Sequence, residues 1–171
     1  MSQLNVNTIT TLSGTDITIP TGKKLVVTDS GGLSVPGTVV QVVSQPWTGQ
    51  QIVTSSSYVA VTNSSVVITP KFSTSKVLIM CHLNLYWPNN NEIACVVYRG
   101  GSAVVPNDGL ADCYNGVSDG ITTASLTYLD SPATTSATAY QVYIKRTQGS
   151  GTTYTNLRST TSVITVMEIA Q

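Results

Sequence analysis

The apolar residues of positions 1–37 recur as short pairs. Three apolar-x-apolar pairs follow one another at intervals of eight residues: Ile17 and Ile19, Leu25 and Val27, and Leu33 and Val35. An apolar residue at every second position is the period of a β-strand with one buried face. Glycines lie between the pairs and mark turns. The pattern predicts a fibrous β-repeat in which each pair is one short strand, stacked along an axis.

This repeat carries too few apolar side chains to fold as a single copy. Full burial of an apolar side chain contributes roughly 1.5–3 kcal/mol, whereas ordering each backbone residue costs about 1–2 kcal/mol. We therefore expect several copies to wind together into a stalk of the β-prism or triple β-helix type. The predicted core of that oligomer is formed by the paired residues Ile17, Ile19, Leu25, Val27, Leu33 and Val35.

Residues 38–171 show the period of strands throughout and no helical period. The longest alternation runs from Lys76 to Trp87, with an apolar residue at every second position from Val77 to Leu85. The other predicted strands are 38–44, 51–54, 58–62, 65–69, 92–99, 121–129, 140–145, 152–158 and 162–169, and residues 100–120 are predicted to be irregular. The chain is therefore expected to be all-β, with an attachment and stalk segment (1–37) and a jelly-roll-type β-sandwich head (38–171).

Composition and charge exclude several classes of function. Charged residues make up only 9% of the 171 residues and the net charge is zero, whereas soluble domains average about 25%. Binding of nucleic acid is not expected, since the required basic cluster is missing. No apolar run approaches eighteen residues, so membrane insertion is not expected, and the first residues do not resemble a signal peptide.

The sequence offers little for catalysis or metal binding. His82, the only histidine, lies within an apolar strand and is expected to be partly buried, and the two glutamates form no close pair. Asp108, Asp112 and Asp119 could supply oxygen ligands to calcium, but they fit no EF-hand spacing and are better explained as solvated turn residues. Cys81, Cys95 and Cys113 are predicted to be reduced, buried thiols. We expect no enzyme, no cofactor and no metal.

A binding surface is predicted near the middle of the chain, where aromatic residues adjoin asparagines. Aromatic rings stack on sugar rings, and amide side chains bond their hydroxyl groups. The candidate receptor-binding residues are Tyr86, Trp87, Asn89, Asn90, Asn91, Tyr114 and Asn115. The alternative is that Tyr86 and Trp87 cap the core while the asparagines form a turn. Trp47 is expected to pack where stalk and head join.

Four stretches resemble a type of bacteriophage tail-fibre-like virion structural protein that is common in phages of aquatic bacteria, including cyanobacteria. They are residues 1–9, Ile19–Gly32, Leu129–Tyr140 and Ser162–Ala170. The resemblance implies a homotrimeric appendage of the virion, assembled in the host cytoplasm. Its N-terminus would dock on other virion proteins, and its head would bind a host-surface glycan or receptor.

Two other functions remain open at this point. A capsid decoration (cement) protein would also be trimeric and would use its N-terminus to staple shell subunits. A small polysaccharide depolymerase is less expected, because such enzymes usually need longer chains with a broad groove.

Overall fold

Strand β5 (Lys76–Trp87) shows how the alternation of the sequence builds this fold. In the computed structural model, which describes residues 19–28, 32–33, 35–87, 90–106, 109–116 and 120–171, every second side chain of β5 is buried, from Val77 to Trp87. The side chains between them lie on the outer surface. One face of β5 therefore belongs to a core and the other to the surface, which is the pattern of a strand in a two-layered protein.

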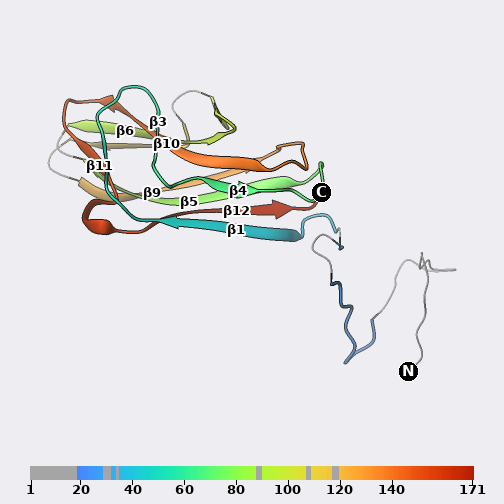
Figure 1. Cartoon of the computed structure of the whole chain (residues 1–171). Coiled ribbons are helices and arrows are strands. Elements are labelled where there is room, and N and C mark those ends of the chain that lie inside the picture. The colour runs from blue at the N-terminus through green and yellow to red at the C-terminus, as the bar shows by residue number, and fades with distance from the viewer. Residues whose placement is uncertain (1–18, 29–31, 34, 88–89, 107–108, 117–119) are drawn as a thin grey trace.

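The described chain forms two six-stranded antiparallel sheets that pack face to face (Figure 1). The first sheet contains β1 (Val39–Trp47), β2 (Gln51–Val53), β5, β9 (Gly120–Asp130), β11 (Thr153–Thr155) and β12 (Ser162–Ile169). The second contains β3 (Val59–Ala60), β4 (Val66–Ile68), β6 (Asn91–Arg99), β7 (Ser102–Ala103), β8 (Ala111–Asn115) and β10 (Thr138–Gln148). A short 3-10 turn, η1 (Leu157–Ser159), lies between β11 and β12.

Strand β5 is the centre of the first sheet. One of its edges pairs with β12 and, further along, with β11, while its other edge pairs with β9 over the whole length of β5. Strand β1 extends the sheet beyond β12, and β2 extends it beyond β11. Two four-strand arrays therefore share β5 and β9: one that includes β1 and β12, and one that includes β2 and β11.

The core lies between the two sheets. The inward side chains of β5 pack against Ile93, Cys95 and Val97 of β6 and against Tyr140, Val142 and Ile144 of β10. These six residues of β6 and β10 are each at most 2% exposed. The predicted all-β fold and its β-sandwich head are confirmed, while the jelly-roll type of its connections stays a prediction. No helix in the described ranges is long and apolar enough to cross a membrane.

Several strand bounds differ from the prediction. β5 and β12 have the predicted ends, but β1 continues to Trp47, and residues 100–120 contain β7 and β8 instead of irregular chain alone. Trp47 is 4% exposed and sits at the end of β1 that is remote from the N-terminal segment. The expectation that Trp47 packs at the stalk–head junction is therefore wrong, because β1 begins at that junction and Trp47 is the last residue of the strand, at its other end.

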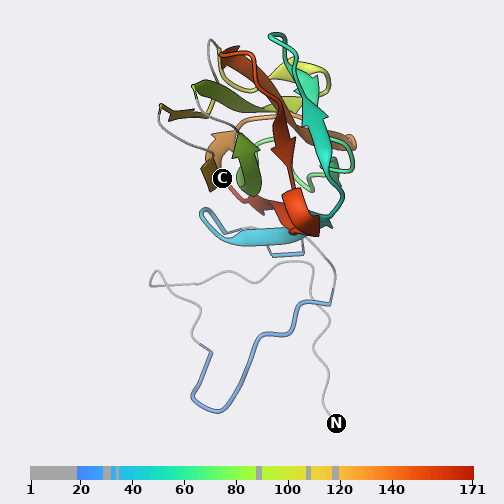
Figure 2. The ribbon, with the colours of Figure 1, turned by 90° about the vertical axis from the view of Figure 1, so that its left-hand side faces the viewer.

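The N-terminal segment leaves the head beside the C-terminus. The backbone N–H of Gly37 donates to Ala170 at 2.8 Å, and the N–H of Ala170 donates to Thr38 at 2.9 Å. Just before this point the chain turns, with the N–H and hydroxyl of Thr38 both donating to the carbonyl of Val35. We call this end of the sandwich the proximal end and the opposite end the distal end. Figure 2 looks at the sandwich from its distal end.

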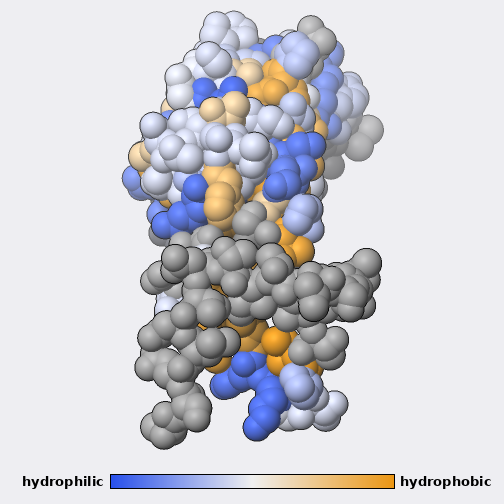
Figure 3. All heavy atoms as spheres, turned by 90° about the vertical axis from the view of Figure 1, so that its right-hand side faces the viewer, coloured by the Kyte–Doolittle hydropathy of each residue, from blue (hydrophilic) through white to orange (hydrophobic). Residues whose placement is uncertain are grey.

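The predicted strands of the stalk are not formed in the described part of the single chain. Residues 19–28 contain one turn and no strand, and the apolar side chains that should form the oligomer core are exposed: Ile19, Leu25, Val27, Leu33 and Val35. Ile17 lies outside the described residues. Hydrophobic atoms are accordingly visible on the segment and at the proximal end of the head (Figure 3). Among the described residues of one chain these side chains stay exposed, and their assembly with further copies stays a prediction.

Candidate ligand-binding surface

The strand register of the first sheet brings four large side chains into one row at its distal end. Ile52 of β2 pairs with Tyr154 of β11, Tyr154 pairs with Tyr86 of β5, and Tyr86 pairs with Ile121 of β9. Directly paired residues of antiparallel strands point to the same face of the sheet. We call Ile52, Tyr154, Tyr86 and Ile121 the distal row.

The distal row is open to solvent at both ends and aromatic at its centre. Ile52 and Ile121 are 59% and 67% exposed, and Tyr86 and Tyr154 are half-buried. The two tyrosine rings have centroids 5.6 Å apart and planes inclined by 48°. Large exposed apolar side chains in a contiguous row mark an interaction surface, and tilted tyrosine rings present both C–H edges and hydroxyl groups to a ligand.

A hollow lies at each end of the distal row. One has a volume of about 510 Å³, and Ile52 lines it together with polar residues: Thr48, Gly49, Gln50, Gln51, Thr62 and Asn63. The other, of about 150 Å³, is lined by Ile121 with Asn84, Leu85, Leu157, Arg158 and Thr160. The row therefore connects two depressions that contain hydrogen-bonding groups, an arrangement suited to an extended ligand with several polar substituents.

Two of the residues predicted for receptor binding do not belong to this surface. Trp87 is 4% exposed, because it continues the inward face of β5 after Leu83 and Leu85. Asn91 is fully buried, and its Oδ1 accepts the backbone N–H of Gly151 at 3.2 Å. These two assignments are corrected: the tryptophan is a core residue, and the asparagine fastens the turn after β10 to the start of β6.

The remaining predicted residues are spread over different elements. Tyr86 lies in the distal row, Asn90 is exposed in the turn before β6, and Tyr114 is 57% exposed on β8 of the second sheet. Asn115 ends β8, and neither its side chain nor Asn89 is among the described parts of the chain. The structure thus brings Tyr86 together with residues that the sequence analysis did not select.

Those additional residues are Tyr154, Ile52 and Ile121. The sequence signal that could have identified them is weak, since their positions beside Tyr86 depend on which strands pair and in what register. β11 and β2 are three residues each, and short segments of this kind carry little period. Only the pairing of β11 with both β2 and β5 places the second tyrosine and the exposed isoleucines on one face.

A second aromatic cluster lies on the second sheet, but its rings are occupied by one another. Tyr98 and Tyr143 stack with centroids 3.9 Å apart, and Tyr58 approaches Tyr98 at 6.0 Å. The ammonium group of Lys145 lies 4.8 Å from the centre of the Tyr58 ring. These contacts use the ring faces within the protein, so the distal row is the better candidate for a ligand.

The middle of the outer face of the first sheet is mostly polar, with Met80 and Val163 as half-buried apolar exceptions. His82 is exposed there, which corrects the expectation that it is partly buried, and Val163 and Ser125 are its paired neighbours. Asn84 lies closer to the distal row, where its Oδ1 accepts the Thr123 hydroxyl at 3.0 Å. No group of three His, Cys, Asp or Glu side chains that could hold a metal ion occurs among the residues with described placement.

The cysteines take no part in this surface. Cys81 and Cys95 are buried, as predicted, and Cys113 is half-buried. Burial raises the pKa of Cys81 to about 12, so its thiol stays protonated at neutral pH. A buried, protonated thiol is a packing group and not a nucleophile.

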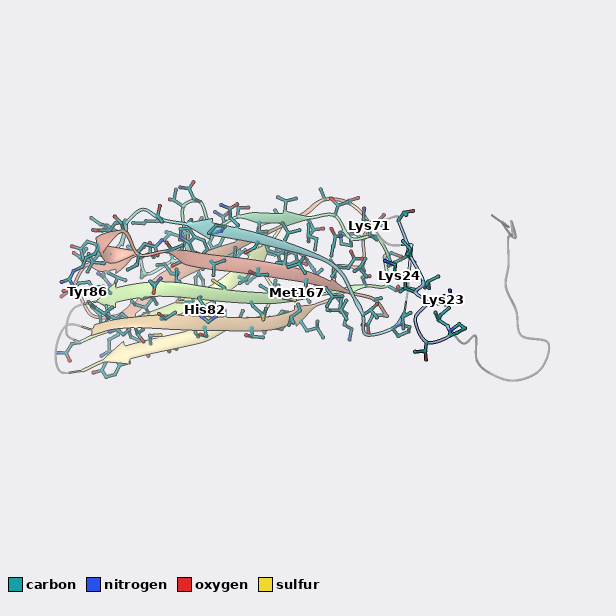
Figure 4. The ribbon with its side chains drawn as sticks, turned by 90° about the horizontal axis from the view of Figure 1, so that it is seen from below. Lys23, Lys24, Lys71, His82, Tyr86 and Met167 are labelled. Carbon is teal, nitrogen blue, oxygen red and sulfur yellow. The ribbon has the colours of Figure 1, made fainter. Side chains whose placement is uncertain are left out.

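A second apolar row crosses the outer face at the proximal end. Val42 of β1 pairs with Met167 of β12, Met167 with Leu78 of β5, and Leu78 with Leu129 of β9. Val42 and Leu129 are 54% and 46% exposed. We call Val42, Met167, Leu78 and Leu129 the proximal row. Figure 4 shows Tyr86, His82 and Met167 in this order along the face, from the distal end toward the N-terminal segment.

Comparisons with known proteins give a faint likeness only. No family model matches the chain, and no curated protein matches it. Among solved structures, that of the infectious bursal disease virus Gx strain is 16% identical with a TM-score of 0.44, covering 80% of this chain and 38% of the viral one.

Two further structures from the same virus are similar at a comparable level. Derived T=1 particles match with 11% identity, a TM-score of 0.42 and coverage of 87% and 41%. The VP2 subviral particle matches with 13% identity, a TM-score of 0.40 and coverage of 87% and 42%. The chain spans about two fifths of the length of these proteins. At such scores the likeness carries no functional argument.

Proposed function

We propose that this chain is a non-enzymatic attachment subunit of a bacteriophage virion appendage, which binds a host-surface glycan through the distal row. The observation that carries the proposal is the distribution of apolar and polar side chains along the outer face of the first sheet. This face has an apolar row at each end. The exposed side chains between the rows are mostly polar, such as His82, and the apolar Met80 and Val163 are only half-buried exceptions. A molecule that assembles at one end and recognises a ligand at the other needs this separation.

The distal end suits a glycan because its groups match those of sugars. The tilted rings of Tyr86 and Tyr154 provide the stacking surface. The larger hollow provides amide and hydroxyl side chains from Gln50, Thr62 and Asn63. Loops and short strands supported by a rigid sandwich are a common location of binding sites.

The proximal end suits assembly. The proximal row and the exposed apolar residues of the N-terminal segment lie at the same end of the head. In a homotrimer, packing of three segments and the adjoining faces would remove both sets from water. The same end would then dock on other virion proteins and leave the distal row facing outward.

A binding assay on an array of bacterial surface glycans tests the recognition part of this proposal. The full chain should bind a subset of the array, and Tyr86→Ala should weaken that binding by about tenfold, the equivalent of about 1–2 kcal/mol of lost aromatic contact. Tyr143→Ala is the matched control, since it removes a half-buried ring from the outer face of the second sheet. A chain that binds no glycan, or a Tyr86→Ala variant that binds like the unchanged chain, contradicts the proposal.

A capsid decoration protein is the second candidate, and the same proximal surface favours it, because a protein that docks on a shell also needs one adhesive end. Electron microscopy of particles that carry the chain separates the two. Density at the tail supports the attachment subunit, and density distributed over the shell supports the decoration protein.

A further inference from the structure

We propose that the smaller hollow beside the distal row binds an acidic sugar residue, with Arg158 pairing with its carboxylate. This inference rests on the proposed function and names the class of glycan within it. Its evidence comes from the hollow itself: the placement of one cation, the backbone that holds it, and the charge of its surroundings.

Arg158 lies on η1, and both Arg158 and Ile121 line the hollow. Its side chain is exposed. Within the described ranges the one ion pair joins Arg99 to Asp130, so the Arg158 guanidinium has no carboxylate partner there. A guanidinium presents two parallel N–H donors that match the two oxygens of a carboxylate. The hollow therefore offers an unused anion-binding group next to an apolar wall.

The backbone that carries Arg158 adopts an unfavourable conformation. Asn156, Arg158 and Ser159 have φ angles of 51°, 60° and 60°, in the left-handed region that residues other than glycine rarely occupy. Three such residues within four positions form a strained turn. Strain of this kind persists only where surrounding contacts enforce it, and it concentrates at binding and catalytic sites.

Buried hydrogen bonds of Asn156 enforce this turn. Its side chain is fully buried, with Oδ1 accepting the hydroxyl of Ser162 at 2.5 Å and Nδ2 donating to the carbonyl of Trp47 at 3.4 Å. Its backbone N–H donates to the carbonyl of Asn84 at 3.0 Å. The turn is thereby tied to β1, β5 and β12 at once. Arg158 is presented from a rigid base, which lowers the entropy lost when it binds a ligand.

The described charges of the first sheet favour an anion. The described acidic residues of the first sheet are Asp130 and Glu168, which are buried and pair in register with Val77 at the proximal end of β5. No described carboxylate of this sheet therefore lies near the hollow to repel a negative ligand. Ile121 belongs to both the distal row and the hollow. One sugar ring on the tyrosines and the next in the hollow would place an acidic substituent beside Arg158.

Charge-paired oligosaccharides test this inference with the full chain. Each uronic-acid-containing oligosaccharide on an array is accompanied by its carboxyl-reduced form, which keeps the ring shape and removes the charge. At least one acidic member should bind about tenfold more tightly than its reduced form, the size expected for a charge-assisted hydrogen bond. Arg158→Gln should abolish the difference and Arg158→Lys should retain part of it.

Lys76→Gln is the control variant, because it removes a cation from the proximal end of β5, whereas the hollow lies at the distal end of that strand. It should leave the preference for acidic members unchanged, and melting temperatures should confirm that all variants fold. Equal binding of charged and reduced forms, still dependent on Tyr86, would overturn the acidic-sugar inference and leave the proposed function standing. Absence of binding to every member would overturn both.

Discussion

The guanidinium of Arg99 donates through Nη1 to both carboxylate oxygens of Asp130, at 2.8 and 2.7 Å, and so joins β6 of one sheet to β9 of the other. The hydroxyl of the fully buried Tyr140 donates to the same carboxylate at 2.7 Å. Burial, together with the hydrogen bond to Asp130, raises the pKa of Tyr140, so the phenol remains a donor at neutral pH.

Removal of this carboxylate should destabilise the sandwich. Asp130→Ala leaves the Tyr140 hydroxyl buried without its acceptor, at a cost of about 1–3 kcal/mol. Urea unfolding measures the loss, and Thr127→Ala is the control, since Thr127 is exposed on the same strand. Equal stability of the two variants would show that the link contributes nothing.

Glu168 should make the stability depend on acidity. Burial alone would raise its pKa, but the side chain of Gln41 donates to Oε2 at 2.6 Å, and backbone N–H groups of Lys71 and Phe72 donate to Oε1, so the pKa is lowered overall. A lowered pKa means that the stabilisation is present above the unfolded value, about 4.3 for glutamate. It is lost as the pH falls through the folded value.

Glu168→Gln should therefore be less stable than the unchanged chain at pH 7, and the difference should narrow as the pH falls below about 4.3. Urea unfolding of both proteins from pH 7 to pH 3 gives the comparison. Glu92→Gln serves as the control for a half-buried glutamate on the surface of β6. A difference that stays constant over this range argues against the carboxylate as its origin.

Trp87 should affect stability and not recognition. Trp87→Ala empties a site in the core and should cost about 3–5 kcal/mol of unfolding free energy. The variant should melt early, and the fraction that remains folded should bind glycan normally. Thermal melting combined with the array assay checks both. Normal melting with lost binding would return Trp87 to the ligand surface.

The proximal row should control self-association. Leu129→Lys places a charge among apolar side chains that three adjoining copies would bury, and it should shift the chain toward the monomer. Ser125→Lys is the matched control, since Ser125 is exposed on the same strand in the polar middle of the face. Sedimentation analysis measures the oligomer. An unchanged oligomer in Leu129→Lys would place the interface elsewhere.

Much of the fold could be predicted because the alternation of apolar residues within a strand is visible in the sequence of that strand alone. The alternation in β5 and β12 predicts both ends of each strand. In β5 it also indicates that Trp87 is buried. The inward face of β5 is formed by Val77, Ile79, Cys81, Leu83 and Leu85. Trp87 is the next residue on that face, two positions after Leu85. Extending the period to the end of the strand places the tryptophan in the core and Tyr86 outside.

The candidate site could be predicted only in part, because its members come from segments far apart in the sequence. Tyr86 was selected for its aromatic ring, but Tyr154 meets it only through the pairing of β11 with β5. The position of Arg158 depends on a turn that is enforced by buried contacts of Asn156. No local sequence pattern predicts a left-handed backbone conformation at a residue other than glycine. Strand β8 escaped prediction because Ala111–Asn115 is only five residues long and contains a single apolar pair, Ala111 and Cys113.

Two backbone hydrogen bonds join Gly37 and Thr38 to Ala170. They hold the C-terminus at the same end of the head as the N-terminal segment. A tag fused after Gln171 would consequently tether the protein to a sensor chip or bead with its far end directed into the sample. Coupling through that tag gives every captured molecule one orientation, whereas random coupling through lysines would hide the ligand surface in part of the population.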